Sequence, residues 1–301
     1  MIKPFVKWAG GKGQLLPEIR KTYPAGLGNE IRRYCEPFIG GGAVLFDILS
    51  NHDLDELYIS DINAELILTY SAIRNNVRHL IEILSHMESR YLEHDEEGRN
   101  AFFYEIRERF NNLKTDASSD STELGALFIF LNRTCFNGLY RVNKKGGYNV
   151  PHGKYKNPKI CNESNLLAIS SALANVEIHC CDYRESRDFI SGDTFVYIDP
   201  PYRPLSKTAS FTSYTENIFN DAEQIALADF VTEVSKTGAF VVVSNSDPKN
   251  QDKDDNFFDD LYSEFNINRI SAKRMINSNA SLRGSISELL VTNYWDKNER
   301  F

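Results

Sequence analysis

Short apolar runs alternate with polar or glycine-rich stretches over much of the chain. The runs predict strands at 31–35, 57–61, 176–180, 195–198, 239–243, 265–274 and 288–295, and the intervening patterns predict helices at 43–49 and 63–73. Strands that are apolar throughout are typical of parallel sheets with both faces covered. The pattern therefore predicts an α/β fold whose Rossmann-like, doubly wound sheet is mainly parallel and ends in an antiparallel hairpin.

The region 75–165 breaks this alternation. It begins with a polar helical stretch at 77–112, continues through a Ser- and Asp-rich loop at 114–122, and reaches an apolar helix at 124–131. Because no strand pattern interrupts it, we expect a mostly helical domain at 75–165 inserted into a main domain formed by 1–74 and 166–301.

Basic residues are concentrated in the second half of this insertion. The window 132–160 contains no Asp or Glu and seven basic residues, which are Arg133, Arg141, Lys144, Lys145, Lys154, Lys156 and Lys159. Removing these seven from the net charge of −8 leaves −15 for the remainder. A charged surface that is merely solvated usually mixes both signs, whereas a window of one sign indicates contact with nucleic acid.

Composition excludes several classes of protein. No run of about 18 apolar residues is present, so no membrane-spanning helix is expected. The N-terminus lacks the apolar segment of a signal peptide. The five cysteines show neither zinc-ligand spacing nor a Cys-x-x-Cys motif, which indicates reduced thiols, a cytoplasmic protein and no bound metal.

A glycine-rich loop, Glu-Pro-Phe-Ile-Gly-Gly-Gly, follows the first predicted strand and ends at Gly42. Such a loop lets a ligand approach the backbone closely, and its spacing differs from the dinucleotide-binding Gly-x-Gly-x-x-Gly. Asp61 ends the second strand, where a carboxylate can bind a ribose diol, and Asp182 follows the strand at 176–180, where it can accept from an adenine amine. We therefore expect an adenosine-containing cofactor without a pyrophosphate. The alternative is that both acids only cap helices.

The quartet Asp199-Pro200-Pro201-Tyr202 follows the apolar strand at 194–198, so it lies at the edge where open α/β sheets carry their active sites. The carboxylate and a backbone carbonyl can each accept one proton of an exocyclic amine, and the tyrosine can stack on the base. Two acceptors on one nitrogen draw its lone pair out of conjugation and make it a usable nucleophile. The alternative is a Pro-Pro turn without chemistry.

Seven segments complete this picture in chain order. They are Lys7–Lys12 (KWAGGK), Glu36–Gly42 (EPFIGGG), Ser60–Leu66 (SDINAEL), Phe136–Arg141 (FNGLYR), Asn149–Lys156 (NVPHGKYK), Asp199–Tyr202 (DPPY) and Thr208–Tyr214. Together they resemble the Dam-type DNA adenine-N6 methyltransferases, in the class whose recognition region lies between the cofactor motif and the catalytic motif. The resemblance covers nearly the whole chain.

The resemblance implies S-adenosylmethionine as cofactor, double-stranded DNA as partner and no metal. The positions matching the family's cofactor contacts are Trp8, Lys12, Phe38, Gly40, Asp61, Asp182 and Asp199. The positions expected at DNA are Asn137, Leu139, Arg141, Pro151, Lys154 and Tyr155. Arg141 can bind guanine bidentately, and Leu139 is either a wedge between bases or a core contact. Relatives often carry arginine at position 154, so this contact differs here.

The expected reaction is direct transfer of a methyl group to the N6 amine of an adenine that has left the base stack, within GATC as the resemblance favours. Residues after the quartet (Lys207, Ser210 and Tyr214) and Arg283 in the polar loop 277–285 are expected near the substrate. A methyltransferase of another acceptor or DNA site, and a non-enzymatic DNA-binding module with a vestigial pocket, stay open as alternatives. Whether a cognate restriction endonuclease acts separately also stays open.

Overall fold

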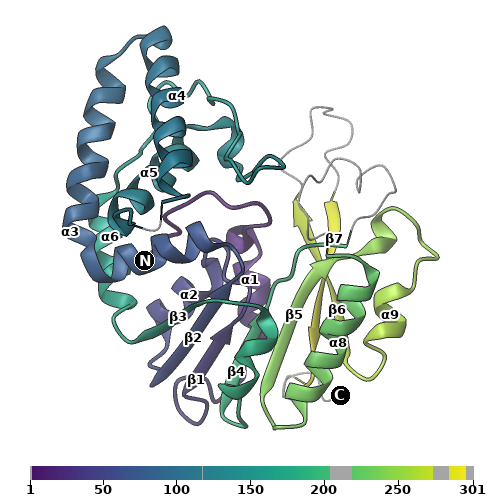
Figure 1. Cartoon of the computed structure of the whole chain (residues 1–301). Helices are drawn as coiled ribbons and strands as arrows, with labels where there is room; N and C mark the ends of the chain where they lie inside the picture. Colours follow the sequence, from purple (N-terminus) through teal and green to yellow (C-terminus); the bar gives the residue numbers. More distant parts are fainter. Residues whose placement is uncertain (1, 117, 204–218, 274–284, 296–301) are drawn as a thin grey trace. The chain divides into compact units, whose positions relative to one another are not determined.

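The computed structural model describes residues 2–116, 118–203, 219–273 and 285–295. These residues include a seven-stranded sheet in the order β3-β2-β1-β4-β5-β7-β6 (Figure 1). The strands are β1 Arg33–Glu36, β2 Glu56–Asp61, β3 Val176–Cys180, β4 Thr194–Ile198, β5 Phe240–Ser246, β6 Asn266–Lys273 and β7 Ser285–Thr292. β4 is parallel to β1 and β5, whereas β7 is antiparallel to β5 and β6. The predicted mainly parallel sheet with a terminal antiparallel pair is confirmed.

Strand boundaries differ from the apolar runs at the end of the chain. β5 extends past its apolar run to Ser246, and β7 begins at Ser285. The ladder continues because Ser246 pairs with Glu288 and Ser244 pairs with Leu290. Polar residues at the carboxyl end of β5 are therefore part of the sheet, a position that apolar periodicity alone does not reveal.

Two compact units make up the chain. The first comprises Met1–Gly11, Ile39–Asn51 and Ile59–Cys181, and the second comprises Lys12–Phe38, His52–Tyr58 and Asp182–Phe301. The first unit thus contains the whole predicted insertion 75–165 together with the glycines of the loop and Asp61. The second unit contains the Asp199 quartet.

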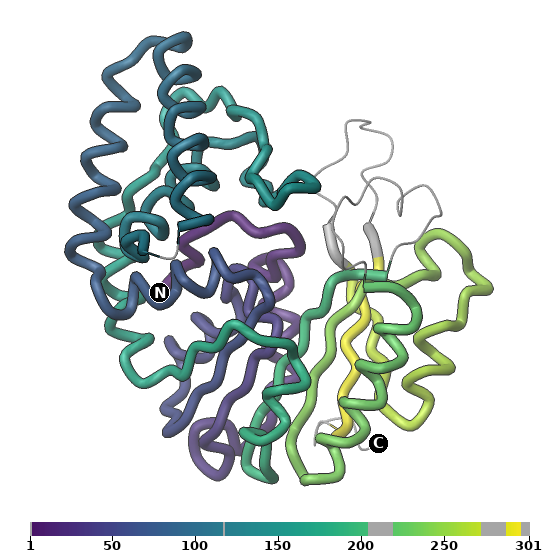
Figure 2. The backbone as a smooth tube through the Cα atoms, in the orientation of Figure 1, coloured from purple at the N-terminus to yellow at the C-terminus, as the bar shows by residue number. Residues whose placement is uncertain are grey.

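Helices dominate the first unit (Figures 1 and 2). They are α2 Ala43–Asn51, α3 Ala64–Glu93, α4 Glu96–Leu113, α5 Ser121–Thr134 and α6 Glu163–Ala172. α3 joins the predicted helix 63–73 to the polar stretch beyond it, with a kink at Asn76 whose side chain donates to Thr122 Oγ1 at 3.2 Å. α3, α4 and α5 pack around fully buried rings such as Tyr91, Phe103 and Phe130.

The second unit is built on the parallel strands β1, β4 and β5. It also holds α1 Leu16–Ile19, α8 Asp221–Ser235 and α9 Phe257–Leu261, with α8 packed beside β5 (Figure 1). All five residues of β4 are buried, as expected for a central strand covered on both faces. The carboxyl end of β4 therefore emerges between two parallel neighbours, which is where this fold class places functional groups. Within the described part of the chain, no helix is long and apolar enough to cross a bilayer.

Candidate active site and nucleic-acid interface

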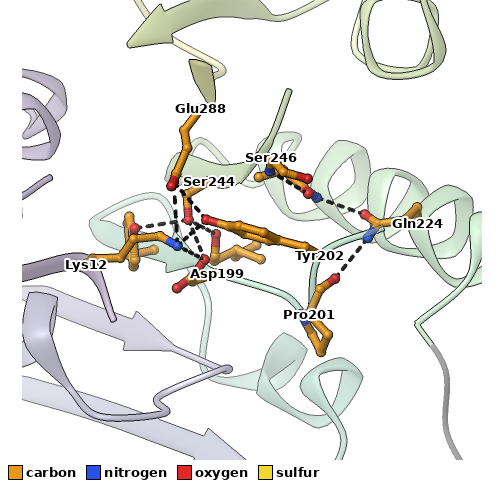
Figure 3. Close-up of polar contacts among 11 residues, drawn as sticks. Lys12, Asp199, Pro201, Tyr202, Gln224, Ser244, Ser246 and Glu288 are labelled. Atoms are coloured by element: carbon orange, nitrogen blue, oxygen red, sulfur yellow. Dashed lines mark hydrogen bonds and ion pairs between the residues drawn. The ribbon is translucent and has the colours of Figure 1, made fainter. Parts of the chain in front are cut away.

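Asp199 is the first residue after β4, and two donors bind one of its oxygens (Figure 3). Lys12 Nζ lies 2.8 Å from Asp199 Oδ1, and Ser244 Oγ of β5 donates to the same oxygen at 2.8 Å. The Ser244 hydroxyl in turn accepts from Tyr197 at 3.0 Å. Asp199 is thus held as an oriented carboxylate at the strand end by donors on one of its oxygens.

Tyr202 is bound through both sides of its hydroxyl group (Figure 3). Lys12 Nζ donates to the hydroxyl oxygen at 2.5 Å, and the hydroxyl donates to Glu288 Oε2 of β7 at 2.7 Å. Burial and the carboxylates of Asp199 and Glu288 raise the pKa of Tyr202 well above its usual value, so the group stays a hydroxyl donor. We call Lys12, Asp199, Tyr202, Ser244 and Glu288 the charged cluster. Reasoning from the sequence identified neither Ser244 nor Glu288.

The loop of the quartet is also held through its backbone. Gln224 of α8 donates from Nε2 to the carbonyl of Pro201 at 3.1 Å, and the buried Asn245 donates to Gln224 Oε1 at 3.1 Å (Figure 3). Arg203 then closes the loop with hydrogen bonds to both carboxylate oxygens of Asp221, at 2.6 and 3.0 Å, and to Asp255 at 2.7 Å. These hydrogen bonds fix the position of the quartet and of Arg203.

The first unit contains the glycine loop and Asp61. Asp61 accepts from the backbone N–H of Gly40 at 3.1 Å and of Asn63 at 2.9 Å. Burial raises the pKa of Asp61, and these backbone donors oppose the rise. The Trp8 ring covers the loop so closely that a Cβ on Gly40, at φ 45°, would lie 2.8 Å from Trp8 Cδ1. The structure therefore brings Trp8, Gly40 and Asp61 together.

The remaining predicted cofactor residues lie in the second unit. The half-buried Phe38 ring stacks on Tyr183 with centroids 5.3 Å apart, which provides an apolar surface of the kind that an adenine ring contacts. Asp182 caps the short helix Tyr183–Asp188 and pairs with Arg184 at 3.1 Å. The capping role considered for Asp182 is thus real, although its carboxylate stays about half exposed. Lys12, expected at the cofactor, contacts Asp199 and Tyr202.

The basic window forms a loop and hairpin that we call the recognition segment, residues 136–160. Asn137 and Gly138 have φ of 55° and 63°, and a Cβ on Gly138 would lie 2.4 Å from the Lys7 side chain. The buried Asn132 binds the backbone of Lys7 in both directions, at 2.7 and 2.8 Å, and the carbonyl of Gly138 at 3.0 Å. This tight turn leaves Asn137, Leu139 and Arg141 exposed.

Helix α4 supports the recognition segment along its length. The side chains of Arg99, Arg107, Asn111 and Lys114 donate to the carbonyls of Lys156, Val150, Tyr148 and Gly146 respectively. The contacts run antiparallel, because residues later in α4, and Lys114 just after it, bind carbonyls earlier in the segment. These polar side chains of α4 therefore have a structural role.

Individual basic residues differ in their surroundings. Arg133 donates to the carbonyls of Phe5 and Pro4 at 3.0 and 3.2 Å, so it supports the N-terminal segment and adds little to the basic surface. Lys154 has φ 53° and lies 3.2 Å from Glu96, with both side chains at least 70% exposed. Lys144, Lys145, Lys156 and Lys159 are exposed, as is Pro151, whereas Tyr155 is half-buried under Lys7 Nζ, 4.2 Å from its ring centroid.

Two further findings complete the site. Phe136 is 51% exposed beside Asn137, and the sequence interpretation did not single it out. Among the residues described by the structure, no group of three His, Cys, Asp or Glu side chains could hold a metal ion. The predictions for Lys207, Ser210, Tyr214 and Arg283 concern residues outside those described.

Comparison with known proteins identifies the chemistry that this geometry serves. The pattern defining the family described as "D12 class N6 adenine-specific DNA methyltransferase" matches residues 8–276. The chain belongs to this family. It is an adenine-specific DNA methyltransferase, and the predicted family and enzyme class are confirmed.

Curated relatives are similar to this chain over nearly their full length. The Type II methyltransferase M.MjaIII of Methanocaldococcus jannaschii is 50% identical over 97% of this chain and 99% of its own. The Type II methyltransferase M1.LlaDCHI of Lactococcus lactis subsp. cremoris is 37% identical over 97% and 96%. A DNA adenine methylase of Vibrio cholerae is 35% identical over 96% and 95%. The similarity therefore includes both the recognition segment and the charged cluster.

Proposed function

We propose that this methyltransferase transfers a methyl group from S-adenosylmethionine to the N6 amine of an adenine flipped out of double-stranded DNA, within GATC. The observation that carries the proposal is the charged cluster, in which Asp199 and the Tyr202 ring are fixed at the carboxyl end of β4. The adenine amine needs a hydrogen-bond acceptor, which Asp199 supplies, and the adenine ring needs a stacking surface, which Tyr202 supplies.

The chain's own residues perform the positioning. Asp199 and the Pro200 carbonyl would each accept one N–H of the amine, while the Tyr202 ring holds the base plane. The cofactor supplies an activated methyl on a positively charged sulfur, so the new N–C bond forms as the S–C bond breaks. The positive charge then passes to the nitrogen, where the Asp199 carboxylate stabilises it and can take the released proton. No covalent bond to the enzyme is needed.

The residues present fit the proposed cofactor. Trp8, Gly40 and Asp61 of the first unit combine a close backbone approach with a carboxylate for ribose hydroxyls. In the second unit, Phe38 offers an aromatic surface for adenine and Asp182 an exposed acceptor for its amine. Lys12 is assigned to the charged cluster as well as to the cofactor.

The recognition segment is proposed to contact DNA, within a target-recognition domain at 75–165. Arg141 would read guanine O6 and N7, because its guanidinium is exposed and is oriented by Asn149, to which Nε donates at 2.7 Å. Leu139, 39% exposed, suits a wedge better than a core contact. Asn137, Pro151 and Tyr155 would flank the target.

The exposed lysines of the segment, Lys154 included, would bind phosphates, which position the duplex without specifying its sequence. The sequence window that contains them has no Asp or Glu, and among these lysines Lys154 has an acid from outside the window, Glu96, at 3.2 Å.

Labelled S-adenosylmethionine and unmethylated plasmid DNA test the proposal. After incubation, the plasmid is digested with an endonuclease that cuts GATC only when its adenine is unmethylated. Label on DNA together with protection from cutting is the expected result. Label without protection contradicts GATC but retains the reaction, and absence of label on DNA rejects the proposed donor or acceptor. A Tyr202→Ala variant in parallel controls for a contaminating methyltransferase.

A further inference from the structure

Glu288 is the one acid of the charged cluster that lies outside the motif segments. It belongs to β7, is paired in register with Ser246, and precedes the fully buried Leu289 and Leu290. Its side chain is 13% exposed and lies 3.8 Å from Lys12 Nζ, on the far side of the Tyr202 hydroxyl from the ring (Figure 3). Pairing of β7 with β5 on one side and with β6 on the other fixes the backbone that carries this carboxylate.

The charges of the cluster do not cancel. Lys12 contributes one positive charge, and Asp199 and Glu288 contribute one negative charge each. A carboxylate oxygen of each acid lies within 4 Å of Lys12 Nζ. With Asp199 alone, the ammonium would neutralise the group that has to face an amine acquiring positive charge. A second carboxylate leaves one net negative charge, which is what the reacting nitrogen requires.

We propose that Glu288 is a positioning residue for methyl transfer, acting as the counter-ion of Lys12 so that the charge of Asp199 stays available to the adenine amine. This inference rests on the proposed function, because it assumes that positive charge develops on an amine beside Asp199. Glu288 touches neither substrate nor cofactor and acts through Lys12 and Tyr202.

A purely structural role makes a different prediction. If Glu288 only fixed the Tyr202 hydroxyl, glutamine would serve as well, since its amide oxygen also accepts a hydrogen bond. Removing the hydroxyl with Tyr202→Phe would then make the identity of residue 288 irrelevant. If the charge matters, Glu288→Gln slows the reaction in both backgrounds.

The test measures single-turnover methyl transfer from S-adenosylmethionine to a GATC duplex, with both at saturation. We expect Glu288→Gln to lower the rate on the order of 10- to 100-fold, less than the loss of a group contacting the reacting atoms. Duplex and cofactor dissociation constants should stay within about twofold, because the charge acts on the reacting nitrogen. Glu288→Asp should recover part of the rate.

Glu264→Gln, the same change at an exposed acid of the second unit, is the matched control and should have wild-type rate. Melting temperatures of all variants show whether each is folded. A wild-type rate in Glu288→Gln, or no further slowing when it is combined with Tyr202→Phe, overturns the inference. A wild-type enzyme that transfers no methyl to the duplex rejects the proposed function instead, so the two failures are distinguishable.

Discussion

The charged cluster and the recognition segment are ordered in opposite ways. In the cluster, side chains bind one another, and Lys12, Asp199 and Glu288 are only 4%, 20% and 13% exposed. Lys12 and Glu288 both contact the Tyr202 hydroxyl, whereas Lys12 and Ser244 both contact Asp199 Oδ1. In the recognition segment the backbone is bound by Asn132, by three side chains of α4 and by Lys114, the residue that follows α4. The segment's own long side chains are largely exposed.

This contrast fits the role proposed for each region. Stabilising charge in a reaction requires dipoles and charges that are already oriented. The polar groups of the cluster therefore bind one another. Reading a partner requires polar groups that are still available, on a backbone already in the required shape, which lowers the entropy cost of binding. Changes to side chains should therefore affect the cluster most, and changes to backbone conformation should affect the segment.

The largest effect is expected for Asp199→Ala. The variant loses the acceptor that faces the amine, so turnover should fall on the order of 10³-fold. Its affinity for the duplex should stay close to that of the wild type, because Asp199 belongs to the second unit and not to the recognition segment. Label transfer measures turnover and gel-shift titration measures duplex affinity, with the wild type and Glu264→Gln as controls. Simultaneous loss of duplex binding would contradict the division of roles.

A backbone change tests the recognition segment. In Gly138→Ala, a Cβ at φ 63° collides with Lys7, so we expect a loss of stability above the about 1–2 kcal/mol that left-handed backbone alone costs, with weaker duplex binding. Gly146→Ala is the matched control, because its φ is 76° and nothing lies within 4 Å of the added Cβ. Urea unfolding and duplex titration of both variants make the comparison. Equal effects of the two would show that the contact with Lys7 is unimportant.

Arg141→Ala separates reading from positioning. Loss of a bidentate guanine contact should cost about 1–3 kcal/mol of discrimination between GATC and duplexes altered at one base pair. Lys144→Ala should weaken binding to all duplexes alike. It should also reduce the salt dependence of binding by the contribution of about one phosphate contact. Competition titrations at two salt concentrations measure both. If Lys144→Ala changes discrimination more than Arg141→Ala, the assignment is wrong.

The smallest effect concerns His152. Burial lowers its pKa below the ordinary value of 6.5, and the nearby Lys154 adds to the shift, while Tyr91 lies 2.6 Å from its Nε2. Because the folded protein favours the neutral ring, the stabilising contribution is complete above pH 6.5 and is lost as the pH falls below it. His152→Gln should reduce the acid-induced fall in melting temperature by a degree or two, roughly. Scanning fluorimetry at about pH 7 and about pH 5 measures the fall in melting temperature. A fall in His152→Gln equal to that of the wild type argues against this role.

The two regions also differ in how far the sequence revealed them. Asp199 and Tyr202 belong to one tetrapeptide that directly follows an apolar strand, so their place at a sheet edge could be predicted. Glu288 could not, because its meeting with Tyr202 depends on the antiparallel register of β7 on β5. Asp182 was correctly placed after β3, but the choice between capping and binding needed coordinates.

The recognition segment was found by charge, yet its support was not. Arg107 and Asn111 are ordinary polar positions on a helix, and only the fold shows that they hold the hairpin backbone. Counting charges also treated Arg133 like its neighbours, although its guanidinium binds the carbonyls of the N-terminal segment. Composition reports that a surface is basic, and packing decides which residues form it.

The most direct test of this division of roles is to measure the duplex dissociation constant and the single-turnover methylation rate of Asp199→Ala and Arg141→Ala side by side. Asp199→Ala should bind GATC duplex like the wild type and transfer almost no methyl group. Arg141→Ala should lose discrimination between duplexes and keep most of its rate on saturating GATC duplex. If either variant loses both properties while remaining folded, catalysis and recognition are not separated as proposed.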